Sequence, residues 1–308
     1  MAKAKTFKPS GAVRKSRGEY IFEAIVIIVL IVLSACMLFP FINLLAKSFS
    51  SEAYVITGNV FLVPKGFQLG TYAFVLKQSQ FFTSLKNTVI ITLAGTFGAM
   101  IVNCMTAYPL SRTRLVGRKG LILYFVFTML FSGGMVPNYL LRNAMGLLNT
   151  LWVLFLPGLL SVYNMILLKN FFEEIPEEIE ESAQLDGAGS MTVLFRIILP
   201  MSLPAIATIG LFYAVSFWNN YMDGVLYITR AKFKPLQQYL YEVVTEMERV
   251  DKAAALGQMD ADMALNASLS TESIRAATIM IASVPIMLVY PFLQKYFVAG
   301  LRVGSVKG

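Results

Sequence analysis

Six stretches of the sequence carry no Asp, Glu, Lys or Arg and are at least 19 residues long. They are the windows 24–46, 87–111, 120–141, 143–168, 197–222 and 276–294. A membrane-spanning helix needs about 20 mostly apolar residues, and it satisfies its own backbone hydrogen bonds where lipid cannot. The composition agrees, since 56% of the residues are hydrophobic and the mean hydropathy is +0.64. We therefore expect an all-α polytopic membrane protein, with six transmembrane helices in one domain, residues 24–294.

The distribution of Lys and Arg predicts how these helices are oriented. An even number of spans places both termini on the same side of the membrane. If that side is the cytoplasm, the segments on it hold 15 Lys and Arg in 73 residues, against 11 in 94 residues outside. Cytoplasmic loops carry an excess of these residues, so the prediction is N-in and C-in. The basic N-terminus 1–23 and the tail 295–308 are then cytoplasmic, and the loop 223–275 is extracytoplasmic.

Several kinds of chemistry are excluded by the residues that the sequence lacks. It contains no histidine, and both cysteines, Cys36 and Cys104, fall inside predicted spans. Ser–His and Cys–His nucleophilic pairs and the commonest zinc sites are therefore excluded. No G-x-x-x-x-G-K-[ST] phosphate-binding loop occurs, so any ATP must be bound by another subunit. We expect a chain that is not an enzyme and has no cofactor, and whose net charge of +8 reflects membrane sidedness rather than nucleic-acid binding.

Between two of the apolar windows lies an acidic segment, residues 171–200. It carries seven acidic residues between Glu173 and Asp186. Pro176 suits the first position of a helix, and Gly187 is the residue best able to end it in a left-handed conformation. Ser190 can then cap a second short helix. The expected structure is helix, glycine turn, helix; on composition alone, a solvated acidic loop stays open as an interpretation.

The spacing within this segment resembles the EAA motif, E-A-A-x3-G-x9-I-x-L-P, of membrane permease subunits of ABC importers. Ser182 in place of the first alanine is the one departure. The resemblance implies that this segment is the cytoplasmic coupling helix, which sits in a cleft of the ATP-hydrolysing subunit. The residues it places in ATPase coupling are Glu181, Ser182, Ala183, Asp186, Gly187, Ile197, Leu199 and Pro200.

Further stretches resemble the carbohydrate class of these permeases, which is of the maltose type. The run SGGMVPNYL at 132–140, the run GLLNTLW at 146–152 and the tail 304–308 resemble its oligosaccharide subgroup, which includes lipo-oligosaccharide and aldouronate-type transporters. This resemblance implies a multi-pass protein of the bacterial plasma membrane. The implied partners are a second homologous permease, a dimer of ATP-binding subunits that hold ATP and Mg, and an extracytoplasmic solute-binding protein. In the family, the loop 223–275 would reach that protein.

Polar and aromatic residues inside the spans are candidates for a substrate path. They are Asn103, Asn164, Tyr213, Trp218 and Asn219. Aromatic faces beside amides suit a sugar, which offers C–H faces and hydroxyls together. Each also has a simpler interpretation, because amides hold helices together within membranes and Trp218 lies where an interfacial aromatic belt is expected.

Three structural expectations and two rival functions complete the interpretation. We expect 47–86 to be rich in turns rather than helical and 236–250 to be a helix. The glycines of 132–139 are expected to serve close packing, with Pro137 interrupting the helical hydrogen bonds, and a gate stays open as the other interpretation of this run. One rival is a self-sufficient secondary transporter or channel, which usually has ionisable residues within its spans. The other is a membrane enzyme, which would need catalytic carboxylates or histidines at the interface.

Overall fold

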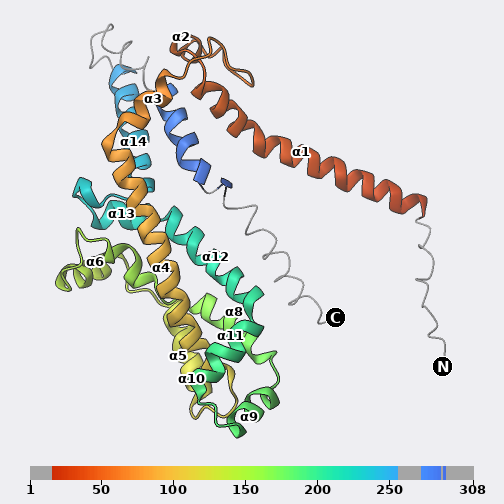
Figure 1. Cartoon of the computed structure of the whole chain (residues 1–308). Coiled ribbons are helices and arrows are strands. Elements are labelled where there is room, and N and C mark those ends of the chain that lie inside the picture. Colours follow the sequence, from red (N-terminus) through yellow and green to blue (C-terminus); the bar gives the residue numbers. More distant parts are fainter. Residues whose placement is uncertain (1–15, 256–271, 286, 289–308) are drawn as a thin grey trace.

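The computed structural model describes residues 16–255, 272–285 and 287–288, and within them every regular element is a helix. The long helix α4 (Ser79–Ser111) is the axis around which the other helices gather. Figure 1 shows it running from α3 (Gly70–Lys77) at one end to the region of α9 (Glu177–Leu185) at the other. At 33 residues, and with a rise of about 1.5 Å per residue, α4 is longer than a bilayer's hydrocarbon core requires.

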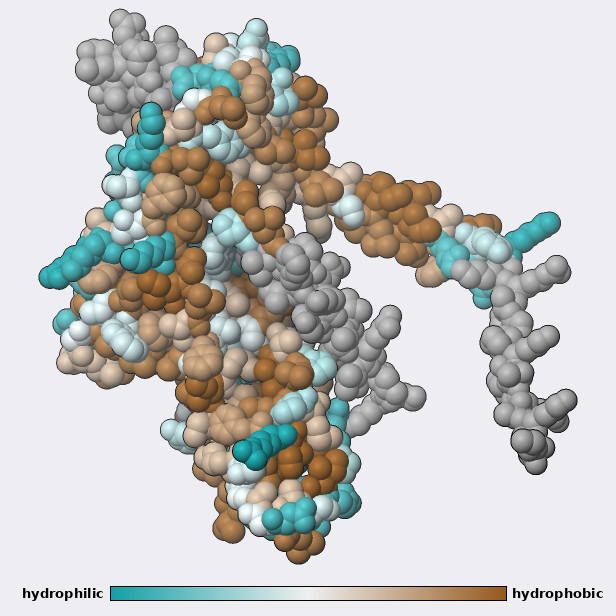
Figure 2. All heavy atoms as spheres, viewed as in Figure 1, coloured by the Kyte–Doolittle hydropathy of each residue, from teal (hydrophilic) through white to brown (hydrophobic). Residues whose placement is uncertain are grey.

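The first helix, α1 (Arg17–Ser48), extends away from the other helices (Figure 1). Its side chains are apolar and exposed over most of its length, as the brown surface in Figure 2 shows. Its C-terminal end is fastened to the rest of the described chain: Ala46 and Ser48 are buried, and Asn43 donates to the carbonyl oxygens of Val60 (3.1 Å) and Phe61 (2.7 Å). Such a surface suits contact with lipid or with another apolar helix.

The expectation that 47–86 is not helical was wrong. This stretch contains α2 (Glu52–Ile56), α3 and the first turns of α4, which begins at Ser79 instead of residue 87. Turns do occur between them, with Gly58 and Gly66 at positive φ. The helices there were missed because they are short, and the charged residues among them removed them from the apolar windows.

Three of the predicted spans are bent rather than straight. The window 120–141 forms α5 (Arg118–Leu130) and α6 (Met135–Ala144), which meet at 108°. The bend falls at Gly134, whose φ is +87°, and Pro137 lies within the first turn of α6. The break in this run therefore falls at Gly134 rather than at Pro137, and close packing is not seen at Gly134 among the described residues, since a Cβ there would meet nothing within 4 Å.

The next two spans are also broken. The window 143–168 forms α7 (Trp152–Phe155), η1 (Leu156–Gly158) and α8 (Val162–Glu173), with a bend of 46°. The window 197–222 is divided between two helices, one over 190–201 and the other α12 (Leu203–Asn219). The angle between them is 87°. The helix over 190–201 is built from α10 (Ser190–Val193), the π-helical turn η2 (Leu194–Ile198) and α11 (Leu199–Met201).

Among the described residues, two helices are long and apolar enough to cross a membrane, and the number is five if each bent pair counts as one span. These findings confirm an all-helical protein with candidate membrane helices. Of the sixth window, 276–285 and 287–288 are helical, and the rest lies outside the described residues, as do 1–15 and the tail 295–308.

The segment after α12 carries α13 (Met222–Tyr227), η3 (Ala231–Phe233) and α14 (Leu236–Ala255). The predicted helix over 236–250 is thus confirmed. Its start belongs to the folded body, since Leu236 is fully buried and its N–H donates to Thr88 Oγ1 of α4 (2.7 Å). Leu236 joins Val75 and Phe81 in a second apolar cluster.

The main apolar core lies where α4 packs against α8 and α12. Gly95 of α4 allows this approach, because a Cβ there would lie 2.9 Å from two ring atoms of Phe217 and 3.1 Å from Cβ of Phe155. Glycine at this place therefore sets how closely α4 and α12 can pack.

We predict that Gly95→Ala lowers the melting temperature of the detergent-purified protein, because overpacking a tight core costs about 1–3 kcal/mol. Gly120→Ala is the matched control: Gly120 is also helical, and a Cβ there would meet nothing within 4 Å. Alanine favours a helix over glycine by roughly 1 kcal/mol, so the control should be neutral or stabilising. Equal melting temperatures for the two variants would contradict the close α4–α12 contact.

Candidate functional site

The acidic segment folds as helix, glycine turn, helix. Helix α9 ends before Gly187, which takes a left-handed φ of +87°, and α10 begins at Ser190. Two details differ from expectation by one residue. Pro176 is the N-cap of α9 instead of its first residue, and Ser190 is the first residue of α10, with Gly189 as the cap.

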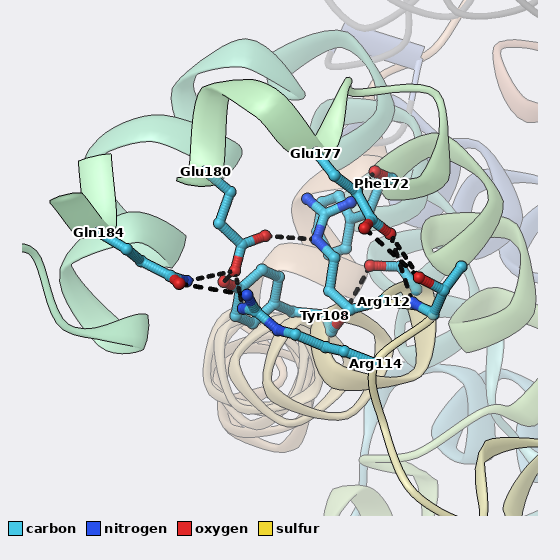
Figure 3. A network of polar contacts seen from close by, with 9 residues as sticks. Tyr108, Arg112, Arg114, Phe172, Glu177, Glu180 and Gln184 are labelled. Carbon is cyan, nitrogen blue, oxygen red and sulfur yellow. Dashed lines mark hydrogen bonds and ion pairs between the residues drawn. The ribbon is translucent and has the colours of Figure 1, made fainter. Parts of the chain in front are cut away.

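The inner face of α9 is fastened to the end of α4 through Glu180, which is only 1% exposed. Arg112 Nε lies 2.6 Å from Glu180 Oε2 in an ion pair, and the Tyr108 hydroxyl donates to Glu180 Oε1 (2.6 Å). Gln184 Nε2 also donates to Oε1 (3.1 Å), and Arg114 forms a second ion pair with the same carboxylate. Figure 3 shows these side chains converging on Glu180.

The rest of the loop after α4 holds the same segment by further contacts. Thr113 donates to Glu177 Oε1 from its backbone N–H (3.4 Å) and from its hydroxyl (3.1 Å). These bonds, the backbone one first, hold the pKa of Glu177 below its usual value because they stabilise the charged carboxylate. Arg112 Nη1 donates to the Phe172 carbonyl (3.0 Å), and Arg118 pairs with Glu173.

These contacts were missed by the sequence analysis. Arg112, Arg114 and Arg118 of the basic loop 112–119 all pair with acids of the segment, whereas the sequence analysis used Lys and Arg only to assign the sides of the membrane. The signal that could have found them is that both loops were predicted to lie on the same side with opposite charge. The acidic segment is therefore neither a free loop nor wholly turned toward a partner.

The outer face of α9 and the turn that follows it carry half of the residues that the motif placed in coupling. Glu181, Ser182, Asp186 and Gly187 are exposed, and the neighbouring Leu185 is 90% exposed. The side chain of a leucine held this far out on a charged helix is available to a partner surface.

The remaining residues of the motif lie closer to the protein's interior. Ala183 is half-buried and packs against the main core, although we expected it on the docking face. Ile197 and Leu199 are also half-buried, and Pro200 is exposed within α11. The small size of Ala183 is therefore explained by packing inside this protein, and a contact between these residues and an ATPase stays a prediction.

Of the predicted path residues, Asn103 and Tyr213 are brought together. Asn103 is fully buried, and its Nδ2 donates to the Tyr213 hydroxyl (2.7 Å) and to the carbonyl of Leu159 (2.9 Å). The Tyr213 hydroxyl also accepts from the Ser161 N–H (2.7 Å). Asn103 thus joins α4 to the α7–α8 break and to α12, which is the helix-joining role considered for it.

Asn164 and Tyr213 line a cavity of about 300 Å³, whereas Trp218 and Asn219 do not. Trp218 is half-buried against the second apolar cluster, and Asn219 is exposed at the end of α12. Sequence reasoning missed other polar residues that also line this cavity, among them Arg142, Ser216 and Asp223. Arg142 stood alone between two apolar windows, and nothing in the sequence indicated that it meets Asp223.

The sequence from residue 99 to residue 303 matches the family of binding-protein-dependent transport system inner membrane components. Because this match covers more than half of the chain, the protein belongs to that family.

Relatives in this family are similar over almost their whole length. The polygalacturonan/rhamnogalacturonan transport system permease protein YtcP of Bacillus subtilis (strain 168) is 39% identical over 288 residues, which are 94% of this chain and 99% of the relative. The trehalose/maltose transport system permease protein MalG of Thermococcus litoralis is 27% identical over 300 residues, 95% of this chain and 99% of the relative. A chain in the crystal structure of a bacterial ABC transporter involved in the import of the acidic polysaccharide alginate is 32% identical, with a TM-score of 0.83, and the match covers 93% of this chain and 100% of that one.

These findings confirm the resemblance to carbohydrate ABC permeases and the prediction that the protein is a permease subunit of an importer. By its description, the family resides in the inner membrane and depends on a binding protein. The relatives are transport proteins, in keeping with a subunit that is not catalytic.

We predict that Glu180→Gln lowers the melting temperature of the purified protein, because it leaves the Arg112 charge buried without its counter-charge. Removing one partner of a buried ion pair lowers the free energy of unfolding by about 3–5 kcal/mol. The decrease for Glu180→Gln should lie near the lower end of this range, because glutamine keeps the shape of glutamate. Glu178→Gln is the control, since Glu178 is exposed on the same helix. If both variants have the same melting temperature as the native protein, Glu180 does not fasten α9 to α4.

Proposed function

We propose that this permease carries an oligosaccharide across the bacterial plasma membrane in an ATP-driven importer. The carbohydrate names of its relatives support this cargo, since two of them are transport permeases for polygalacturonan/rhamnogalacturonan and for trehalose/maltose. The alginate importer, to which the fold is similar over 93% of the chain, supports it as well.

In this proposal the protein has six spans with both termini in the cytoplasm, and it forms half of the translocation path beside a second homologous permease. A dimer of ATP-binding subunits, which holds ATP and Mg, lies against the cytoplasmic face. The solute-binding protein docks on the outer face, where the segment 223–275 is available to it. Asn103, Asn164, Tyr213, Trp218 and Asn219 are the path candidates, and the packing described above favours Asn164 and Tyr213.

The single observation that carries the coupling mechanism is the two-sided character of α9. Its inner face is fixed to α4 by the buried Glu180, and its outer face presents Glu181, Leu185 and Asp186. When ATP binding closes the ATPase dimer, a helix held in this way would move together with α4, and the spans would exchange inward for outward access. The sugar shifts this equilibrium only by its difference in affinity for the two states.

The buried charged residues of the described chain do not lie where the two rival functions, a secondary transporter and a membrane enzyme, would need them. A secondary transporter usually couples through ionisable groups within its spans, yet the buried Glu180 belongs to α9 and is ion-paired. Buried Lys169 lies near the end of α8 and pairs with Glu173 (2.7 Å). A membrane enzyme would need free catalytic carboxylates, whereas Glu173, Glu177 and Glu180 all have partners within the segment's own surroundings.

The experiment that tests the function is uptake by the whole complex in sealed vesicles. The permease would be reconstituted with the second permease, the ATPase subunits and the binding protein encoded beside it. A partial hydrolysate of polygalacturonan and a set of maltodextrins would be supplied outside, with ATP inside. We expect ATP-dependent accumulation of oligosaccharides, detected by mass spectrometry. Accumulation without ATP would support a secondary transporter, and no accumulation of any saccharide would overturn the proposed cargo.

We predict that Gly187→Val abolishes this uptake while the protein stays in the membrane. Valine is strained at the left-handed φ of +87°, so the direction of α10 relative to α9 must change. Gly189→Val is the matched control two residues away, because Gly189 has an ordinary φ of −73° and open space around it. Glu181→Gln should be milder than Gly187→Val, since glutamine keeps the shape and hydrogen bonding. Normal uptake by Gly187→Val would show that this turn does not serve coupling.

A further inference from the structure

A cavity of about 300 Å³ lies between the α7–α8 break and the end of α12. Its polar lining includes Arg142, Asn164, Ser216, Asn220 and Asp223, and the ring of Phe217 adds an apolar wall. Small-molecule sites have volumes of roughly 300–1,000 Å³ and combine apolar walls with a few polar groups. The cavity is therefore at the small end of that range, large enough for one unit of a longer ligand.

One wall is a fixed and electrically balanced arrangement. Arg142 Nη1 lies 3.1 Å from Asp223 Oδ1, and Asn220 Nδ2 donates to Asp223 Oδ2 (2.7 Å). The guanidinium of Arg142 also stacks over the Tyr227 ring, 4.2 Å from its centre. Because the positive and negative charges already pair, this wall attracts neither a free anion nor a free cation. It does leave further N–H donors of Arg142 and lone pairs of Asp223 for hydrogen bonds.

The lining of the cavity also includes a polar side chain that lacks a hydrogen-bond partner among the described residues. Asn164 is only 8% exposed, and its backbone N–H is satisfied by Ser161 Oγ (3.4 Å). Within the part of the chain that the structure describes, its carboxamide has no hydrogen-bond partner, and the residue lines the cavity. The amide atoms of Asn164 are not among the fully buried polar atoms that lack a partner, so they are open to the cavity and can hydrogen-bond a ligand there. Ser216 adds a hydroxyl to the same space.

We propose that this cavity is a saccharide subsite of the translocation path, in which Asn164, Ser216 and the Arg142–Asp223 pair hydrogen-bond the hydroxyls of one sugar unit. A hydroxyl donates and accepts at once, as the amide and the paired charges require. The pyranose C–H face would lie against Phe217. This inference rests on the proposed cargo, and it adds that this subunit itself holds the sugar through its hydroxyls rather than through a carboxylate.

The test compares sugar imported per ATP hydrolysed in the reconstituted complex, with the saccharide that the native complex accumulates from the same hydrolysate and maltodextrins. In Asn164→Ala we expect ATP hydrolysis to respond normally to the loaded binding protein, while sugar imported per ATP falls about 2- to 10-fold, the range that corresponds to losing one hydrogen bond. Ser216→Ala should show a smaller fall in the same ratio. Asn170→Ala is the control, because Asn170 is exposed on the same helix and lies outside the cavity.

Each outcome decides the proposal. A purely structural role for Asn164 would lower assembly or the ATPase response as well as the ratio, and this would overturn the inference. Ratios equal to the native one in both cavity variants would mean that the cavity holds water only. Because Ser216 is exposed in the cavity, Ser216→Ala tests the proposal even if Asn164→Ala fails to assemble. If the native complex imports no saccharide at all, the proposed function itself fails, which these variants do not address.

Discussion

The buried ion pair between Glu180 and Arg112 is the interaction on which the arrangement of α9 against the end of α4 depends. Both groups are removed from water, which costs several kcal/mol per ion unless each charge is matched. Glu180 meets this requirement with ion pairs to Arg112 and Arg114 and with hydrogen bonds from Tyr108 and Gln184. The pair joins α9 to α4, and α4 in turn packs against α8 and α12. A movement of α9 is therefore a movement of the central helix of the fold.

Much of this organisation could be predicted from the sequence. Charge-free windows located the apolar helices, and the spacing around Gly187 predicted both the family and the helix–turn–helix shape of the acidic segment. The bends were not predictable, because the residues on either side of Gly134 are as apolar as a straight span requires. Nor could the sequence decide which of two adjacent carboxylates faces inward. Glu180 meets Arg112 and Arg114 across more than 60 residues of chain, and only packing brings them together.

The same reasoning explains what happened to the candidate path residues. The side-chain amide of Asn103 hydrogen-bonds residues of neighbouring helices, whereas the side-chain amide of Asn164 has no partner among the described residues and faces a cavity. Local sequence could not separate them, since both are amides with apolar surroundings deep within their windows. The carboxylate of Glu180 is thus matched by charges within the chain, whereas the amide of Asn164 faces a space that a ligand can reach.

The central claim, that α9 and the end of α4 move as one body, can be measured as a distance. Spin labels at Leu185→Cys and Val116→Cys would report it, since both positions are about nine-tenths exposed, in a background with Cys36 and Cys104 replaced. Distances would be recorded by pulsed electron resonance in the reconstituted complex, without nucleotide and with ATP trapped. The account predicts the same distance distribution in both states. A shift between the two states that exceeds the width of the distribution would contradict it.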